Sequence, residues 1–450
     1  MKPDKETIRR LHMEQSSITY KDIIKINNYR KLLFSRMIDR FGDSVDALAF
    51  TWLVYQITGS AMWSAIVFAL NMLPNVIVQP FAGAIVEKKN KKKVIIFTYI
   101  LRAAVIALFS VLYTLGLVNA PIMALLTLII TTIESFNLPA DSAFTASVIK
   151  KEHLTCGMSL SKMLTNAASM VGTGIAGVII AAWGAVPAML IDISTFVIAA
   201  VLVLMMKNED PADNRLSTDD ATDKSSDETD KGDHSEKFII LFADGIKYVV
   251  KTPIVRNFCL LCVAINFMLV PINALQAPMA EEIFKMGGEL LSFGGVFASL
   301  GGIAGAALLP VFSKKLTPLQ IICLGTAALG LGLTGIAMGG VVSGNAVLCY
   351  IVVSVCFFTM VLAATLIGGV IGIQFMKSVD KKYMARASAV FNAFSTAAIP
   401  VGSLIVSALV SRIATDKIML FGSIFAGIVL AVTLISRPVL ENGKEITDAA

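Results

Sequence analysis

The sequence predicts an all-α, polytopic membrane protein with twelve transmembrane helices in two halves of six. Three observations predict this class. Hydrophobic residues make up 56% of the 450 residues and charged residues only 16%, whereas soluble domains carry about 25% charged residues. The apolar residues occur in long runs, and about 20 apolar residues suffice to cross a bilayer as a helix. Finally, lysines cluster in alternate loops, as they do in proteins of fixed membrane orientation.

Twelve apolar runs are long enough to span a membrane. In chain order they cover residues 32–57, 62–86, 94–116, 121–140, 160–182, 185–206, 254–275, 290–313, 318–339, 345–375, 385–411 and 417–436. A polar stretch, Lys207–Lys237, separates the sixth run from the seventh. It has few large apolar residues, so we expect a disordered linker there. Residues 238–251 have the pattern of an amphipathic helix on the inner membrane face.

These runs divide the chain into five predicted parts. They are an N-terminal tail at 1–31, a first bundle at 32–206, a linker with its amphipathic helix at 207–253, a second bundle at 254–437 and a tail at 438–450. Glycine-containing ends of spans two and eight both precede lysine clusters, which suggests two parallel repeats related by an axis along the membrane normal.

Lysines in the loops predict the orientation. The loop after span two contains Lys88–Lys93, interrupted only by Asn90, and further basic residues follow spans four, eight and ten. The loops after spans one, three and nine carry neither Lys nor Arg. Basic loops stay in the cytoplasm, so we expect both termini there. The net charge of +6 is interpreted as anchoring to the bilayer and not as nucleic-acid binding.

Cysteine and histidine usage gives no sign of a disulfide framework or a metal site. The pair Cys259 and Cys262 lies inside an apolar run, and the three histidines are scattered along the chain. No loop has the spacing of a nucleotide-binding or catalytic motif. We therefore expect no enzymatic activity and no cofactor. The expected energy source is an ion gradient or the gradient of the substrate itself.

Span one carries charged residues spaced by three and four positions, which places them on one helical face. They are Arg36, Asp39, Arg40, Asp43 and Asp46. A charge at the centre of a span costs about 2.5–3.5 kcal/mol, so this face must meet something polar. Asp43 and Asp46 fall at mid-depth and are candidates for proton coupling; Asp46 has no cation one turn away. Alternatively, Arg36 and Arg40 pair with Asp39 and Asp43 only to hold the helix.

Other polar residues inside the spans are further candidates. Glu134 in span four is the third candidate for proton coupling, and its alternative is an ion pair with Arg36 or Arg40. In span two, where Pro74 is expected to interrupt the helix, polar residues recur every four positions and either line a cavity or hold helices together. The candidates for a substrate cavity are Asp46, Asn71, Asn75, Gln79 and Asn266.

The loop after span two resembles that of the major facilitator superfamily. The family pattern is matched by Gly83, Glu87, Lys91 and Lys92, with Glu in place of the usual Asp. We expect this loop to gate the conformational change and not to bind substrate, because an acid at a helix end beside lysines can latch one half to the other in only one conformation. The resemblance implies a cavity between the halves, lined by spans 1, 2, 4 and 5 and by 7, 8, 10 and 11, with spans three and six at the periphery. A structural or snorkelling role is therefore expected for Arg102 and Asp192.

Three longer stretches are similar to the macrolide-efflux and enterobactin-exporter branch of the drug:proton antiporters. They are Phe41–Asp43, Trp52–Ala61 and Phe136–Ala140. Many such antiporters carry an arginine midway along helix four, and Leu128–Ile133 has none.

Together, the spans and the resemblance imply a monomeric secondary transporter of the cell membrane. We expect it to export amphipathic or lipophilic small molecules in exchange for protons. The alternatives are export of a siderophore, natural product or lysolipid, or a membrane receptor that transports nothing.

Overall fold

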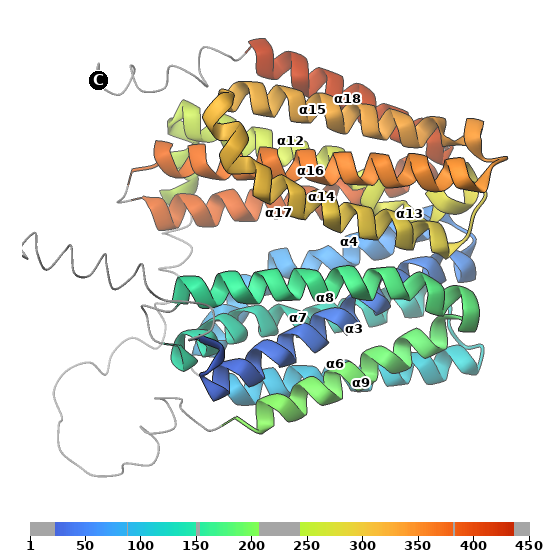
Figure 1. The fold of residues 1–450 in the computed structure, drawn as a ribbon, viewed down its shortest axis with the longest axis vertical. Helices are drawn as coiled ribbons and strands as arrows, with labels where there is room; N and C mark the ends of the chain where they lie inside the picture. Colours follow the sequence, from blue (N-terminus) through green and yellow to red (C-terminus); the bar gives the residue numbers. More distant parts are fainter. Residues whose placement is uncertain (1–22, 88, 150–153, 207–243, 381–382, 436–450) are drawn as a thin grey trace, which may run out of the picture. The chain divides into compact units, whose positions relative to one another are not determined.

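The computed structural model describes residues 23–87, 89–149, 154–206, 244–380 and 383–435, and within these ranges the chain is helical with no strand (Figure 1). The predicted linker and both tails lie outside the described residues, apart from the last residues of the predicted N-terminal tail. The long helices are α3 (Asn27–Thr58), α4 (Ala61–Ile77), α5 (Gln79–Glu87), α6 (Lys91–Thr114), α7 (Ala120–Val148), α8 (Leu154–Trp183), α9 (Ala185–Leu204), α12 (Pro253–Ala274), α14 (Gly288–Lys315), α15 (Pro318–Ala337), α16 (Ala346–Ser378), α17 (Met384–Val410) and α18 (Thr415–Ile435).

Ten segments in the described part of the chain are long and apolar enough to cross a membrane. The first two predicted spans are not among them. Span one corresponds to α3, whose stripe of charges lowers its hydropathy, and span two is split into α4 and the shorter α5. The all-α membrane fold is confirmed, whereas the count of twelve spans stays a prediction.

The break in span two differs from the expectation. Pro74 lies inside α4, which continues to Ile77, and the helical pattern is interrupted at Val78. A proline removes the hydrogen bond to the carbonyl four residues earlier, but neighbouring groups in a bundle can satisfy that carbonyl, so the helix need not end there.

The chain forms two compact units. The first contains Met1–Ala49, Ile77–Val118 and Leu128–Ala221, and the second contains Phe50–Val76, Asn119–Thr127 and Thr222–Ala450. The unit boundaries pass through α3 and α7, so they differ from the predicted division at the linker. The two predicted six-helix halves therefore stay a prediction.

In the first unit, α6 packs along α9, and α3 approaches α8 and α9 closely. Glycines make this approach possible. A Cβ atom on Gly42 of α3 would lie 1.9 Å from Thr195 Oγ1 of α9, and one on Gly172 of α8 would lie 2.6 Å from the Phe41 carbonyl oxygen. Close approach at small residues is a general feature of transmembrane packing.

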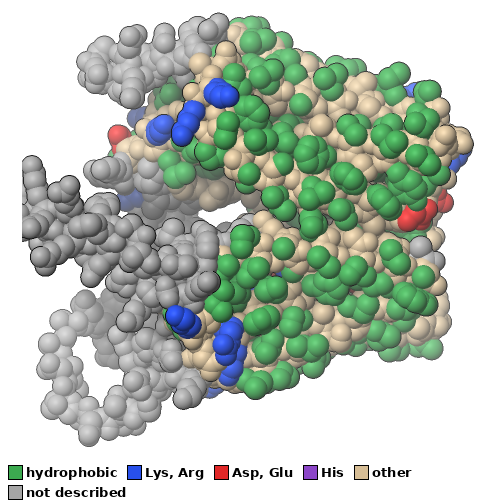
Figure 2. Space-filling view, viewed as in Figure 1, with side chains coloured by type: hydrophobic (Ala, Val, Ile, Leu, Met, Phe, Trp, Pro, Cys, Tyr) green, Lys and Arg blue, Asp and Glu red, His purple; other side chains and the backbone are tan. Residues whose placement is uncertain are grey.

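In the second unit, α16 packs against α14 and α15, α15 packs against α18, and α12 packs against α17. The glycine-rich run of α14 faces the backbone of α16, since a Cβ on Gly301 would lie 2.3 Å from the Phe358 carbonyl oxygen. This run is therefore a packing face of small residues, as is usual between transmembrane helices. Hydrophobic side chains also cover the outer surface of the helices (Figure 2), as is required of a surface in contact with lipid.

The end of the predicted amphipathic helix is helical from Asp244 and packs against neighbouring helices. Val249 is buried with residues of α12, α16 and α17. The Tyr248 ring stacks on Tyr383, with 4.5 Å between ring centroids, and the Tyr248 hydroxyl accepts a hydrogen bond of 3.1 Å from the Asp380 backbone N–H. This helix therefore contacts the chain on both sides of the connection between α16 and α17, at Asp380 and Tyr383.

Candidate functional site

The charged stripe of α3 meets a buried arginine of α6. Arg102 Nη2 lies 2.6 Å from Asp43 Oδ1, and Nη1 lies 3.7 Å from Asp39 Oδ1. The Arg102 side chain is only 6% exposed, and its guanidinium carbon lies 4.2 Å from the centroid of the Phe196 ring of α9. A single guanidinium thus faces two carboxylates of α3 and one aromatic face of α9.

The hydrogen bonding around Arg102 is incomplete. Among the described residues, Arg102 Nε and Asp39 Oδ1 are both buried and have no hydrogen-bond partner. Asp43 also has a second cation, because Arg40 Nη1 lies 3.8 Å from Asp43 Oδ2. The Arg40 side chain is 51% exposed, so this longer contact is screened more strongly than the contact to Arg102.

Asp192 of α9 joins this cluster through the close packing at Gly42. It is buried, and a Cβ on Gly42 would lie 2.6 Å from Asp192 Oδ1. Thr195 donates a 3.4 Å hydrogen bond to Asp192 Oδ1. Asp192 is close enough to Asp46 and Asp43 for their charges to interact.

Asp46 and Glu134, both predicted candidates, complete the cluster without a direct partner of their own. Within the described ranges, no hydrogen bond or ion pair reaches either carboxylate, although both interact electrostatically with Arg102 and Asp43. We call the group formed by Asp39, Asp43, Asp46, Glu134 and Asp192 around Arg102 the acidic cluster. In the described residues it combines five carboxylates with one buried arginine and the half-exposed Arg40.

Arg102 and Asp192 are both buried members of the acidic cluster. Their expected structural or snorkelling role stays a prediction. A signal for the cluster was present in the sequence, since an ionisable residue inside a span is by itself a functional candidate. The spacing within one helix could not show which faces of α6 and α9 turn towards α3.

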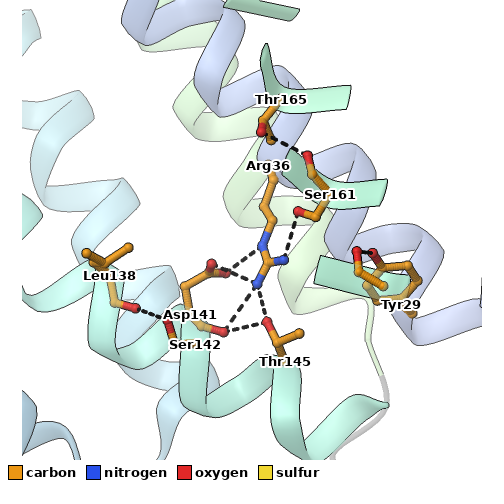
Figure 3. A network of polar contacts seen from close by, with 9 residues as sticks. Tyr29, Arg36, Leu138, Asp141, Ser142, Thr145, Ser161 and Thr165 are labelled. Carbon is orange, nitrogen blue, oxygen red and sulfur yellow. Dashed lines mark hydrogen bonds and ion pairs between the residues drawn. The ribbon is translucent and has the colours of Figure 1, made fainter. Parts of the chain in front are cut away.

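The alternative interpretations pair Arg36 with acids of its own helix or with Glu134. In the structure Arg36 pairs with a different acid. It forms a two-pronged contact with Asp141 of α7, with Nε 2.8 Å from Oδ1 and Nη2 2.7 Å from Oδ2 (Figure 3). It also donates to Thr145 of α7 and, over 3.0 Å, to Ser161 of α8. We call these four residues the Arg36 network. It joins α3, α7 and α8, and Asp141 is not among the candidates that the sequence predicts.

The predicted gating loop lies next to the C-terminal end of α9. Lys92 Nζ donates to the Met206 carbonyl over 2.7 Å, and Lys31 Nζ donates to the Met205 carbonyl over 2.6 Å. Lysines satisfy unpaired carbonyls and oppose the negative end of a helix in this position. A Cβ on Gly83 would lie 4.0 Å from Pro139 Cβ. The Glu87 side chain lies outside the described part, so its gating role stays a prediction.

The predicted cavity residues are distributed over both units. Asn71 and Asn75 are half-buried on α4 in the second unit, whereas Gln79 begins α5 in the first unit. Asn266 of α12 donates to the carbonyl of Cys262 in its own helix over 3.0 Å, and Ser395 of α17 donates to Cys262 Sγ over 3.1 Å. The side-chain amide of Asn266 thus has a hydrogen-bond partner within α12. Its role in a substrate cavity stays a prediction.

Comparison with known proteins identifies the class. The family model described as the Major Facilitator Superfamily matches residues 32–403. The chain therefore belongs to the major facilitator superfamily of membrane transporters.

Two groups of curated relatives are efflux proteins. Macrolide efflux protein A of Streptococcus pyogenes is 22% identical over 92% of this chain and 98% of its own length. The multidrug efflux pump Tap of Mycolicibacterium fortuitum is 23% identical over 55% of this chain and 58% of its own length. An uncharacterized MFS-type transporter of Bacillus subtilis, YkuC, is 25% identical, and the match spans 42% of its length.

Solved structures share the fold at low sequence identity. The nucleoside transporter NupG matches with a TM-score of 0.70 and 10% identity over 91% of this chain and 98% of its own. A bacterial homologue of the iron transporter ferroportin matches with a TM-score of 0.67 and 12% identity over 91% of this chain and 99% of its own. These likenesses show a transporter fold and say nothing about the substrate.

Proposed function

We propose that this transporter exports an amphipathic or lipophilic small molecule from the cell in exchange for protons, by alternating access. The observation that carries the proposal is the surplus of carboxylates in the acidic cluster. Charged groups inside a membrane protein are expensive unless paired, and Arg102 cannot pair with all the carboxylates around it. Bound protons would neutralise the carboxylates that Arg102 leaves without a paired positive charge.

The position of the cluster supports coupling to movement. Its acids come from α3, α7 and α9, so adding or removing a proton changes the attraction between these helices and Arg102 of α6. Proton binding can therefore shift the equilibrium between two packings of the same helices, which is what an antiporter requires.

Asp46 is proposed as the main proton-binding residue, with Asp43 and Glu134 as the other two. Asp43 has the closest cation, at 2.6 Å, and so is held as an ion pair. Asp46 instead faces the charges of Asp43 and Asp192, so a proton on Asp46 relieves repulsion that Arg102 does not cancel.

Export and the substrate class rest on the named relatives, two of which are efflux proteins for macrolides and for multiple drugs. The polar residues of the spans, Asn71, Asn75, Gln79 and Asn266, are proposed to contact the substrate. The orientation with both termini in the cytoplasm is proposed from the lysines of the loops.

The test is transport into inverted membrane vesicles with ethidium as the amphipathic probe. Asp46→Asn should abolish accumulation driven by a pH gradient while leaving counterflow without a gradient measurable. The matched control is Asp416→Asn, in the first turn of α18, which should retain gradient-driven accumulation. If Asp46→Asn accumulates the probe as the unmodified protein does, proton coupling through Asp46 is wrong.

A further inference from the structure

A second group of polar contacts involves the C-terminal end of α3, beyond the residues of the acidic cluster. The Tyr55 hydroxyl donates to Glu282 Oε1 over 2.7 Å, and the Thr415 hydroxyl donates to Glu282 Oε2. All three residues belong to the second unit. Tyr55 ends the first predicted span, whereas Glu282 and Thr415 follow spans seven and eleven, so one carboxylate connects the two predicted halves.

The hydroxyl groups are held by buried residues. Tyr55 is 8% exposed and Thr415 is 1% exposed, so neither can turn into water without moving its helix. Glu282 itself is exposed. Because each carboxylate oxygen accepts from a different helix, the loss of either donor leaves the other contact intact.

The backbone around Glu282 is unusual. Residues Met279–Ile283 form a π-helical turn, in which the Phe284 N–H bonds to the Met279 carbonyl over 3.2 Å. Lys285 follows with φ of 56°, the one positive value at a non-glycine residue in the described chain. π-helical turns and left-handed residues cost free energy and occur often at functional sites.

The turn is anchored on its other side. Phe284 is fully buried, and a Cβ on Gly339 would lie 2.3 Å from its Cζ atom. The turn thus has a fixed base in the second half, and the Glu282 carboxylate projects from it towards Tyr55. A further bond between the same predicted halves, from Ser407 Oγ of α17 to the Met62 carbonyl of α4 over 3.3 Å, lies in the same unit.

We propose that Glu282 is a positioning residue of the transport cycle, and that Tyr55, Glu282 and Thr415 form a latch that opens and closes once per cycle. The proposal rests on the proposed function, because alternating access separates the two halves first at one membrane face and then at the other. On the predicted topology this latch lies at the outer face. Its bonds can therefore form only while the outer ends of the halves are together.

The first experiment measures a distance and needs neither substrate nor a proton gradient. Spin labels are placed at the exposed positions Gln56 and Lys417, in otherwise functional protein reconstituted into lipid nanodiscs. Hydrogen bonds to a charged group are strong, so Tyr55→Phe, Thr415→Val and Glu282→Leu should each raise the ratio of long to short distances, by about tenfold for a single bond. Glu281→Gln, at the exposed neighbouring acid, is the matched control and should leave the ratio unchanged.

The second experiment locks the contact. Crosslinking of Tyr55→Cys to Glu282→Cys with a short, reducible bis-methanethiosulfonate reagent, in a background without other cysteines, should stop ethidium transport, and reduction should restore it. Continued transport by the crosslinked protein would overturn the latch. So would distance distributions that none of the three substitutions alters. Loss of proton coupling in Asp46→Asn, together with distances that the latch substitutions do not alter, would contradict the latch alone. Altered distances together with retained coupling in Asp46→Asn would contradict the proposed function alone.

Discussion

Arg102 Nη2 and Asp43 Oδ1 lie 2.6 Å apart, and this ion pair joins α6 to the charged face of α3. Most of the arginine is buried, and its other side faces the Phe196 ring. Arg102 therefore provides the principal fixed positive charge against which the acidic cluster is balanced.

Replacing Arg102 should affect transport more than folding when the positive charge is kept. The two guanidinium nitrogens reach Asp43 and Asp39 separately, whereas the single ammonium group of lysine can pair closely with only one carboxylate. Arg102→Lys should therefore fold and reach the membrane, with gradient-driven transport reduced about tenfold, as expected for one lost charged hydrogen bond. The measurement is the initial rate of ethidium accumulation in inverted vesicles at matched expression.

Arg102→Gln should lower both stability and transport more than Arg102→Lys does, because it leaves Asp43 and Asp39 buried beside a neutral side chain. Removing one partner of a buried pair costs about 3–5 kcal/mol. Adding Asp43→Asn should restore much of the thermal stability but not the transport. A double variant no more stable than Arg102→Gln would show that the pair does not control folding.

Gly42 determines how closely α3 approaches Asp192. A Cβ there would meet Thr195 Oγ1 at 1.9 Å, and helix backbones in a packed bundle cannot absorb such an overlap without moving apart. Gly42→Ala should lower thermal stability by about 1–3 kcal/mol, the usual cost of overpacking, and reduce gradient-driven transport. Thermal unfolding in detergent, followed by thiol reactivity, measures the first effect.

Two further variants test whether the contact is steric. Gly42→Ala combined with Thr195→Ala removes the obstructing hydroxyl group and should recover part of the loss. Gly372→Ala on α16 is the control, since no atom lies within 4 Å of the added Cβ. Gly372→Ala should be neutral or slightly stabilising, because alanine favours a helix more than glycine does. Equal losses in Gly42→Ala and Gly372→Ala would exclude the steric explanation.

The sequence allowed a good prediction of features that depend on one helix at a time. The apolar runs and the uncharged turn between α3 and α4 both follow from local composition and spacing. The polar stripe of α3 was likewise evident from residues spaced by three and four. The break in span two was placed too early, because proline alone does not end a helix whose freed carbonyl can be satisfied by its neighbours.

The partners of these residues could not be predicted in the same way. The sequence predicts Arg102 on a peripheral span and pairs Arg36 with acids of its own helix or with Glu134. The true partners depend on how α3, α6, α7 and α9 turn about their axes, which is set by contacts such as that of Gly42 with Thr195. One feature of the sequence does point to Asp141: it lies seven residues after Glu134, and positions seven apart share a face of a helix.

The Arg36 network provides a last prediction, about stability. Arg36 and Asp141 are mostly buried, with 12% and 24% of their side chains exposed, and their two-pronged contact joins α3 to α7. Arg36→Gln and Asp141→Asn should each lower the free energy of unfolding by about 3 kcal/mol, since each leaves a charge without its partner. Arg36→Lys should lose less than Arg36→Gln, but still some, because lysine binds a carboxylate as a point charge. Thermal unfolding in detergent is the measurement.

Ser142→Ala is the control, because Ser142 is exposed and donates only to Leu138 of its own helix. In the double variant Arg36→Met with Asp141→Leu, the two losses should not add, because no unpaired charge is left behind. Fully additive losses would show that Arg36 and Asp141 stabilise the protein independently of each other.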